Sequence, residues 1–168
     1  MDRIAHLGFL IKDIARLYVR VFEQRVQHMG VTLDQCKALV YLSRNEGVSQ
    51  IRLAELTGID PMSLVRILDR MEGDGWIERR PHPTDRRARQ LYVKPKAQPL
   101  LEQIASESDA VRAQTLAGLK AQERSVLIDL LERAHANLLE ARVDEAARSE
   151  VQPSASRPRS TKSSRSAR

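Results

Sequence analysis

Arginine side chains gather in one short stretch of the chain, where they can bind negatively charged groups. Between Arg79 and Lys96 the sequence has seven basic residues and a single acidic one, Asp85. A guanidinium group donates several hydrogen bonds in a fixed fork that matches phosphate oxygens, so this cluster predicts a polyanionic partner. Within it, Asp85 stands two residues before Arg87 and could orient that guanidinium on a tight loop.

A second group of basic residues lies in the C-terminal part of the sequence. Beyond Glu150 the sequence has no acidic residue and five basic ones, namely Arg157, Arg159, Lys162, Arg165 and Arg168. Without these five, 23 basic residues face 22 acidic ones, although the whole chain carries a net charge of +6. The charge is therefore focused on two segments, as in proteins that bind nucleic acid.

Other kinds of chemistry have no support in the sequence. We find no phosphate-binding glycine loop, no Ser-His-Asp or Cys-His order and no paired-carboxylate motif, so we expect no enzyme and no cofactor. The four histidines have no metal-ligand spacing, and Cys36 is expected to be a small core residue. A single cysteine, no signal-peptide pattern and no apolar run of about 20 residues predict a cytoplasmic protein that does not span a membrane.

The residues before the arginine cluster predict a helix-turn-helix. Ser49 can cap a helix over 50–57. Asp60 can cap a second helix, which Pro61 begins at the first helical position, where a missing N–H costs nothing. That helix is expected to end at Gly73 to Gly75. Two short helices joined by a tight turn are the form in which proteins place a helix in a DNA groove.

The period then changes from helical to extended. Trp76–Arg80 and Gln90–Val93 predict two short strands, and the two prolines of the segment 81–88 between them exclude a helix there. A strand, a basic loop and a second strand after a helix-turn-helix describe a wing.

Longer helices are expected on both sides of this unit. Apolar residues at three- and four-residue steps predict a helix over 4–29 that Gly30 ends, and a second helix over 33–44. After Pro95 the pattern predicts two more helices with a break near Gly118. From about residue 148 we expect a disordered basic tail rich in serine and arginine.

The wing and the second helix of the pair have distinct expected roles. Arg66 could donate two bonds to guanine in the major groove, while Ser63 could bond a base or a phosphate. Arg87 could enter the narrow, strongly negative minor groove. Arg79, Arg80 and Arg89 are expected to bind phosphates, which adds affinity without sequence choice. Each of these roles has an alternative. Arg66 could simply lie on a solvated helix face, and the wing could be an ordinary exposed basic hairpin.

These residues resemble the MarR family (multiple antibiotic resistance regulators), most of all its SlyA-like branch. The resemblance covers roughly residues 4 to 146 and rests on the helix pair at Leu53 to Gly75 and on the Asp-Arg-Arg run at Asp85 to Arg87. It implies a mainly α fold with a small β-wing: a winged helix-turn-helix lobe over 33–94 and helical dimerisation regions over 1–32 and 95–147, followed by the tail at 148–168.

The resemblance also implies a function and a set of contacts. The homodimer would act as a repressor and bind double-stranded DNA at a palindromic operator, because two-fold protein symmetry demands two matching half-sites. Groove contacts would come from Ser63, Leu64 and Arg66, and Arg87 would enter the minor groove with Asp85 orienting it. The full expected DNA-binding set is Ser63, Leu64, Arg66, Arg70, Arg79, Arg80, Asp85, Arg86, Arg87 and Arg89.

A small aromatic or phenolic effector is the last implication of the resemblance. Arg16 matches a position that contacts carboxylate ligands in SlyA-like relatives, whereas Asp13 replaces a neighbouring arginine of that site. A surface or interface role is the alternative for Arg16. Two other functions stay open for the chain: a nonspecific nucleoid-type DNA binder, which the basic tail favours, and a winged-helix module for protein interaction, which the arginines of the wing disfavour.

Overall fold

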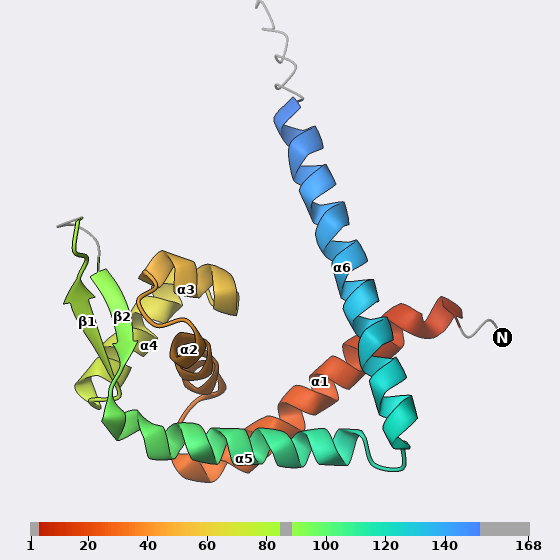
Figure 1. Cartoon of the computed structure of the whole chain (residues 1–168), viewed down its shortest axis with the longest axis horizontal. Coiled ribbons are helices and arrows are strands. Elements are labelled where there is room, and N and C mark those ends of the chain that lie inside the picture. Colours follow the sequence, from red (N-terminus) through yellow and green to blue (C-terminus); the bar gives the residue numbers. More distant parts are fainter. Residues whose placement is uncertain (1–3, 85–88, 152–168) are drawn as a thin grey trace, which may run out of the picture. The chain divides into compact units, whose positions relative to one another are not determined.

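A computed structural model describes the backbone of residues 4–84 and 89–151, and the side chains of residues 4–84 and 89–141. The chain divides after Ala117 into two compact units, which are described separately. The first holds nearly all of the helices and the small sheet, and the second holds one long helix (Figure 1). Helices dominate and the sheet has two antiparallel strands, so the predicted fold class is confirmed.

The elements of the first unit follow the predicted order closely. A short 3-10 turn leads into α1, and another leads from α1 to Gly30, whose φ of +66° ends the helix as predicted. The bounds are η1 Ile4–His6, α1 Leu7–Val26, η2 Gln27–Met29, α2 Leu33–Arg44, α3 Gln50–Thr57, α4 Pro61–Gly73, β1 Ile77–Pro81, β2 Arg89–Val93, η3 Pro95–Ala97 and α5 Gln98–Thr115.

Side-chain caps explain where the three central helices begin. Thr32 and Gln35 form a reciprocal capping box at the start of α2: the Thr32 Oγ1 accepts from the Gln35 N–H at 3.2 Å, and the Gln35 Oε1 accepts from the Thr32 N–H at 2.8 Å. Ser49 caps α3 and Asp60 caps α4, both as predicted. Gly58, with φ +64°, closes α3 and makes the tight turn into α4.

One apolar core holds α2, α3, α4 and the sheet together. Its largest fully buried side chains come from every one of these elements and from α5: Leu39, Leu42, Leu53, Leu64, Leu68, Met71, Ile77, Leu91 and Ile104. Cys36 belongs to the same core and is 2% exposed, so its predicted core role is confirmed. Burial raises the pKa of the Cys36 thiol to about 11, because an apolar environment disfavours the thiolate.

The two strands form a hairpin in which Ile77 pairs with Val93 and Pro81 with Arg89. Strand β1 is shifted by one residue at both ends from its predicted bounds, and β2 begins one residue before its predicted start. The segment before α3 adds a third backbone to this sheet: the Gly47 N–H donates to the Leu91 carbonyl at 2.9 Å, and the Leu91 N–H donates to the Val48 carbonyl at 3.0 Å. The hairpin is therefore bonded to the helix pair and not only packed against it.

The second unit consists of α6, Ala121–Val151. The helix runs past residue 147, where the resemblance ends, and residues 152–168 lie outside the described residues, so the disordered tail stays a prediction. From 121 to 141 every side chain is exposed, including those of Leu130, Leu131 and Leu138. Among the described residues, no helix is both long and apolar enough to cross a membrane.

Candidate nucleic-acid interface

Helix α4 has one face in the core and one face in solvent. Leu64, Leu68 and Met71 are fully buried, whereas Ser63, Arg66 and Arg70 are exposed, as is Met62 at 70%. The Asp60 cap fixes the start of this helix, its carboxylate accepting from the Ser63 N–H at 3.0 Å. The solvent face thus offers a hydroxyl and two guanidinium groups on a rigid helix.

Arg66 and Arg70 differ in how they are held. Within the described part of the chain, Arg66 has no ion pair, so its five N–H donors face solvent. The Arg70 Nε lies 4.0 Å from the Asp74 Oδ2, at the outer limit of an ion pair. Both side chains are therefore available to an approaching polyanion.

Leu64 requires a correction. The family resemblance implies that it contacts the groove, but its side chain is 0% exposed and packs in the core beneath α4. A side chain enclosed on all sides cannot reach a base without leaving the core, which would cost several kcal/mol for a leucine, about 2–5. We therefore assign Leu64 to the core that supports α4.

The position of the Arg79 side chain also disagrees with its expected role in phosphate binding. Its side chain is only 20% exposed, and its guanidinium points back toward α4. The Arg79 Nη2 lies 2.6 Å from the Asp69 Oδ1, and the Nη1 pairs with the Glu72 Oε2. Both ends of the fork are thus occupied by carboxylates of the chain itself.

Arg80 and Arg89 stay on the solvent side of the hairpin. Arg80 pairs with Glu78 on its own strand, and its guanidinium lies 4.3 Å from the centre of the Tyr92 ring, a cation–π arrangement. Arg89 is exposed at the first position of β2, opposite Pro81. Both are exposed on the hairpin. Asp85, Arg86 and Arg87 lie outside the described residues, so their expected contacts stay predictions.

Two acidic residues of this surface were missed by the sequence analysis. Asp69 and Glu72 stand one turn apart on α4, and such a pair is ordinary on a solvated helix. Only the fold shows that Arg79, seven and ten residues later on the neighbouring strand, lies across from both.

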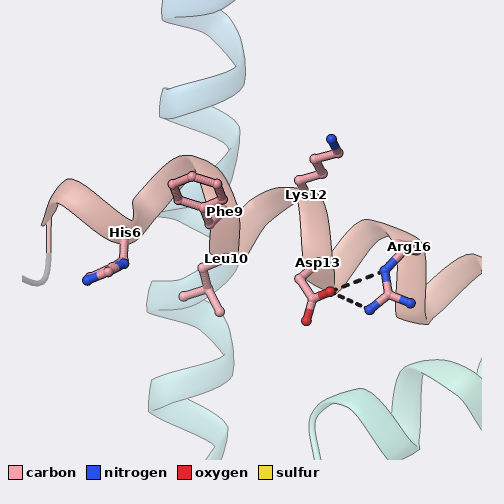
Figure 2. A pocket seen from close by; sticks show the side chains of 6 residues that line it. All are labelled: His6, Phe9, Leu10, Lys12, Asp13 and Arg16. Atoms are coloured by element: carbon pink, nitrogen blue, oxygen red, sulfur yellow. Dashed lines mark hydrogen bonds and ion pairs between the residues drawn. The ribbon is translucent and has the colours of Figure 1, made fainter.

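Arg16, the expected effector residue, lines a shallow hollow of about 450 Å³ on the surface of α1 (Figure 2). The hollow is formed by η1 and α1 alone, from His6, Phe9, Leu10, Lys12, Asp13 and Arg16. The Asp13 Oδ1 accepts from the Arg16 Nη2 at 2.5 Å and from the Nε at 3.2 Å. A carboxylate ligand at Arg16 would therefore compete with a carboxylate already in place.

Comparison with known proteins agrees with this architecture. The model of the MarR family matches residues 31–88, which is the helix pair and the first part of the hairpin. A crystal structure of MarR covers 86% of this chain and 98% of its own, with a TM-score of 0.73 and 24% sequence identity. The transcriptional regulator SlyA covers 84% of this chain and 96% of its own, with a TM-score of 0.68 and 26% identity.

A third similar structure is a mutant of MarR from E. coli complexed with operator DNA. It covers 80% of this chain and 99% of its own, at a TM-score of 0.67 and 25% identity. The match runs through the whole length of these relatives and includes the helices outside the winged segment. The chain therefore has the fold of MarR-family transcriptional regulators, and the model of that family matches its residues 31–88.

Proposed function

We propose that the protein is a sequence-specific DNA-binding regulator that binds a palindromic operator as a homodimer. The observation that carries this proposal is the division of α4, whose buried face fixes it to the lobe while Ser63, Arg66 and Arg70 face solvent. A helix of 13 residues is about 20 Å long and fits the major groove of B-DNA. Arg80 and Arg89 are two further exposed arginines, on the hairpin.

The proposed contacts fall into two classes. Arg66, on the first two turns of α4, is the candidate for reading a base, because a guanidinium can donate to guanine O6 and N7 together. Arg70, Arg80 and Arg89 are candidates for phosphates, which fix register and add affinity. Arg87 with Asp85 is proposed for the minor groove on the strength of the sequence alone.

Two-fold pairing is supported by the apolar surfaces of the terminal helices. On α1, Phe9 is 77% exposed and Ile14 48%, and on α6 Leu131 is 48% exposed. Apolar faces of this extent are rare on a monomer and mark association surfaces. A second copy of the chain would cover them and place two α4 helices on successive half-sites of a palindrome.

Repression is the regulatory outcome that we propose, because a dimer seated on a promoter blocks polymerase sterically. A small aromatic or phenolic effector would release the dimer if it favoured a lobe spacing that does not fit the operator, and its affinity and that of DNA would then be reciprocally coupled. The Asp13–Arg16 pair favours a phenol over a carboxylate at the hollow of Figure 2, since a phenol needs no free guanidinium.

The direct test is to select genomic fragments with the purified protein and read their common sequence. We expect a palindrome whose half-sites are centred about one helical turn, or about 10 base pairs, apart. Binding to that sequence should weaken steeply as salt is raised. Recovery of fragments without a common sequence would contradict specific binding and favour the nonspecific alternative, for which the basic tail after Val151 is the supporting observation.

A further inference from the structure

Arg79 joins the helix expected to enter the major groove to the strand that begins the wing. Its guanidinium reaches Asp69 and Glu72, which stand on successive turns of α4, and its own backbone N–H donates to the Glu72 Oε1 at 3.1 Å. Glu72 therefore uses both carboxylate oxygens on one residue of β1. Arg79, Asp69 and Glu72 are called the Arg79 clamp below.

The clamp ties α4 to the middle of β1, whereas the backbone bonds of the segment 47–49 hold β2. The turn between α4 and β1 is fixed at its root, where the Trp76 N–H donates to the Met71 carbonyl and the Lys94 N–H donates to the Trp76 carbonyl. Farther along the strand, the side-chain polar contacts between α4 and β1 in the described part of the chain all involve Arg79. These contacts resist rotation of β1 about its root, because they attach the strand to α4 at a second point, three residues beyond Trp76.

Electrostatics argue against a phosphate as the partner of Arg79. Two carboxylates face one guanidinium, so the clamp as a whole carries a charge of about −1 and does not attract a polyanion. The Arg79 side chain is 20% exposed, against 58% for Arg80 on the next residue of the strand. A phosphate could reach Arg79 only by displacing a carboxylate that is already bonded to it.

We propose that Arg79, with Asp69 and Glu72, is a positioning residue that fixes the angle between α4 and the wing, so that both fit one DNA site at once. The inference rests on the proposed function. Specific binding requires helix and wing to meet adjacent grooves together, whereas nonspecific binding to phosphates tolerates a loose wing. Loss of the clamp should therefore reduce discrimination between sequences more than it reduces overall attraction to DNA.

The test compares Arg79→Met, Glu72→Gln and the double variant in the full-length protein. The probes are a labelled duplex bearing the sequence selected by the wild type and a scrambled duplex of the same composition, each titrated over a range of salt. We expect each single variant to bind the selected duplex about tenfold more weakly, a change of about 1.4 kcal/mol, and the scrambled duplex as before. The double variant should lose little more than either single one, since one clamp is broken in all three.

Glu72→Gln is the sharper of the two variants. If charge alone mattered, removing the negative charge of Glu72 beside a polyanion should strengthen binding to both duplexes. The clamp predicts the opposite result, which is weaker binding to the selected duplex. The dependence of log K on log salt should also keep its slope in Arg79→Met, whereas loss of a phosphate contact lowers the slope by about 0.9 per contact. Arg89→Met is the matched control and should show that lower slope.

Hydrogen exchange separates the clamp from general unfolding. Amides of β1 should exchange faster in Arg79→Met, while those of α2 stay protected. If Arg79→Met does not fold, Arg79→Lys replaces it: the lysine restores one ion pair and should recover part of the specificity. A reduced salt slope with equal weakening on both duplexes, or stronger binding by Glu72→Gln, would overturn the clamp alone. A wild-type protein that does not prefer the selected duplex would overturn the proposed function and the clamp together.

Discussion

A single arginine at the end of the hairpin carries the most specific expectation about DNA. Arg87→Ala should weaken binding to the selected duplex by about 1–3 kcal/mol, because an arginine in the minor groove meets focused negative potential. Fluorescence anisotropy at fixed salt measures the change. Arg112→Ala on α5, an exposed arginine paired with Asp109, is the control for loss of one positive charge and should bind as the wild type does. Wild-type affinity in Arg87→Ala would contradict the wing assignment.

The buried thiol of Cys36 predicts how stability depends on pH. Its folded-state pKa, about 11, is above the ordinary thiol pKa of 9.0, so the folded protein keeps the proton in a range where the unfolded chain loses it. This contribution is fully present below pH 9 and is lost as pH rises from 9 to 11. By linkage the loss approaches roughly 2–3 kcal/mol of the free energy of unfolding.

Denaturant unfolding of the wild type and of Cys36→Ala at pH 8 and pH 10.5 tests this contribution. The variant starts lower because it leaves a small cavity, but the wild type should lose more stability over the interval. Equal losses in the two proteins would show that Cys36 ionises as readily in the folded protein as in the unfolded chain.

Residues whose role depends on local sequence were predicted well, and those whose role depends on distant neighbours were not. Asp60 and Pro61 are local signals for the start of α4, and both were placed correctly. Arg79 counted as one basic residue among several, because nothing in its vicinity along the chain shows that two carboxylates of α4 lie across from it. Leu64 was given a groove contact from the family pattern although its apolar spacing already indicated the core.

At the scale of elements, the N-caps give a further prediction about α4. Asp60→Ala removes the oxygen that accepts from the Ser63 N–H and should lower the free energy of unfolding by about 1 kcal/mol, with Asp60→Asn close to the wild type. Thr32→Ala removes the corresponding oxygen at α2 and should cost a similar amount. Denaturant titration of the three variants measures these costs.

Only the Asp60 variant should also change DNA binding, since α4 rather than α2 carries the residues proposed to contact the major groove. We expect Asp60→Ala to reduce the preference for the selected duplex as the first turn of α4 frays. If both cap variants changed DNA binding equally, general destabilisation and not the order of α4 would be the cause.

The bounds of α3 and α4 could be predicted because their N-caps and the glycines at their ends are local signals. The third backbone of the sheet, from Gly47 to Ser49, could not, since three residues carry too little pattern and their partner Leu91 is more than 40 residues away. The end of α6 has no such local signal either. Its last turn contains residues such as Ala147 and Arg148, which form helices readily but give no apolar period.

At the scale of the whole molecule, the basic tail should add affinity but no sequence preference. Truncation after Val151 leaves α6 complete and removes all five basic residues of the tail. We expect weaker binding to the scrambled duplex and an unchanged ratio of affinities for the selected and scrambled duplexes, because contacts to phosphates do not read bases. A variant with the five residues changed to glutamine controls for length, and a changed ratio would show that the tail contributes to specificity.

Pairing of two copies makes the strongest demand on the molecule as a whole. Within its own unit, α6 buries none of its side chains from 121 to 141, so its leucines can leave water only against another surface. If that surface belongs to a second copy, folding and association are linked, and the Tm of the wild type should rise with protein concentration. Leu131→Glu should lower the Tm and shift the molar mass in solution toward that of a monomer, while Glu132→Gln, the adjacent polar change, should do neither. A wild-type protein that is monomeric at micromolar concentration, with a Tm independent of concentration, would rule out a stable dimer and with it the reading of two half-sites by one assembly.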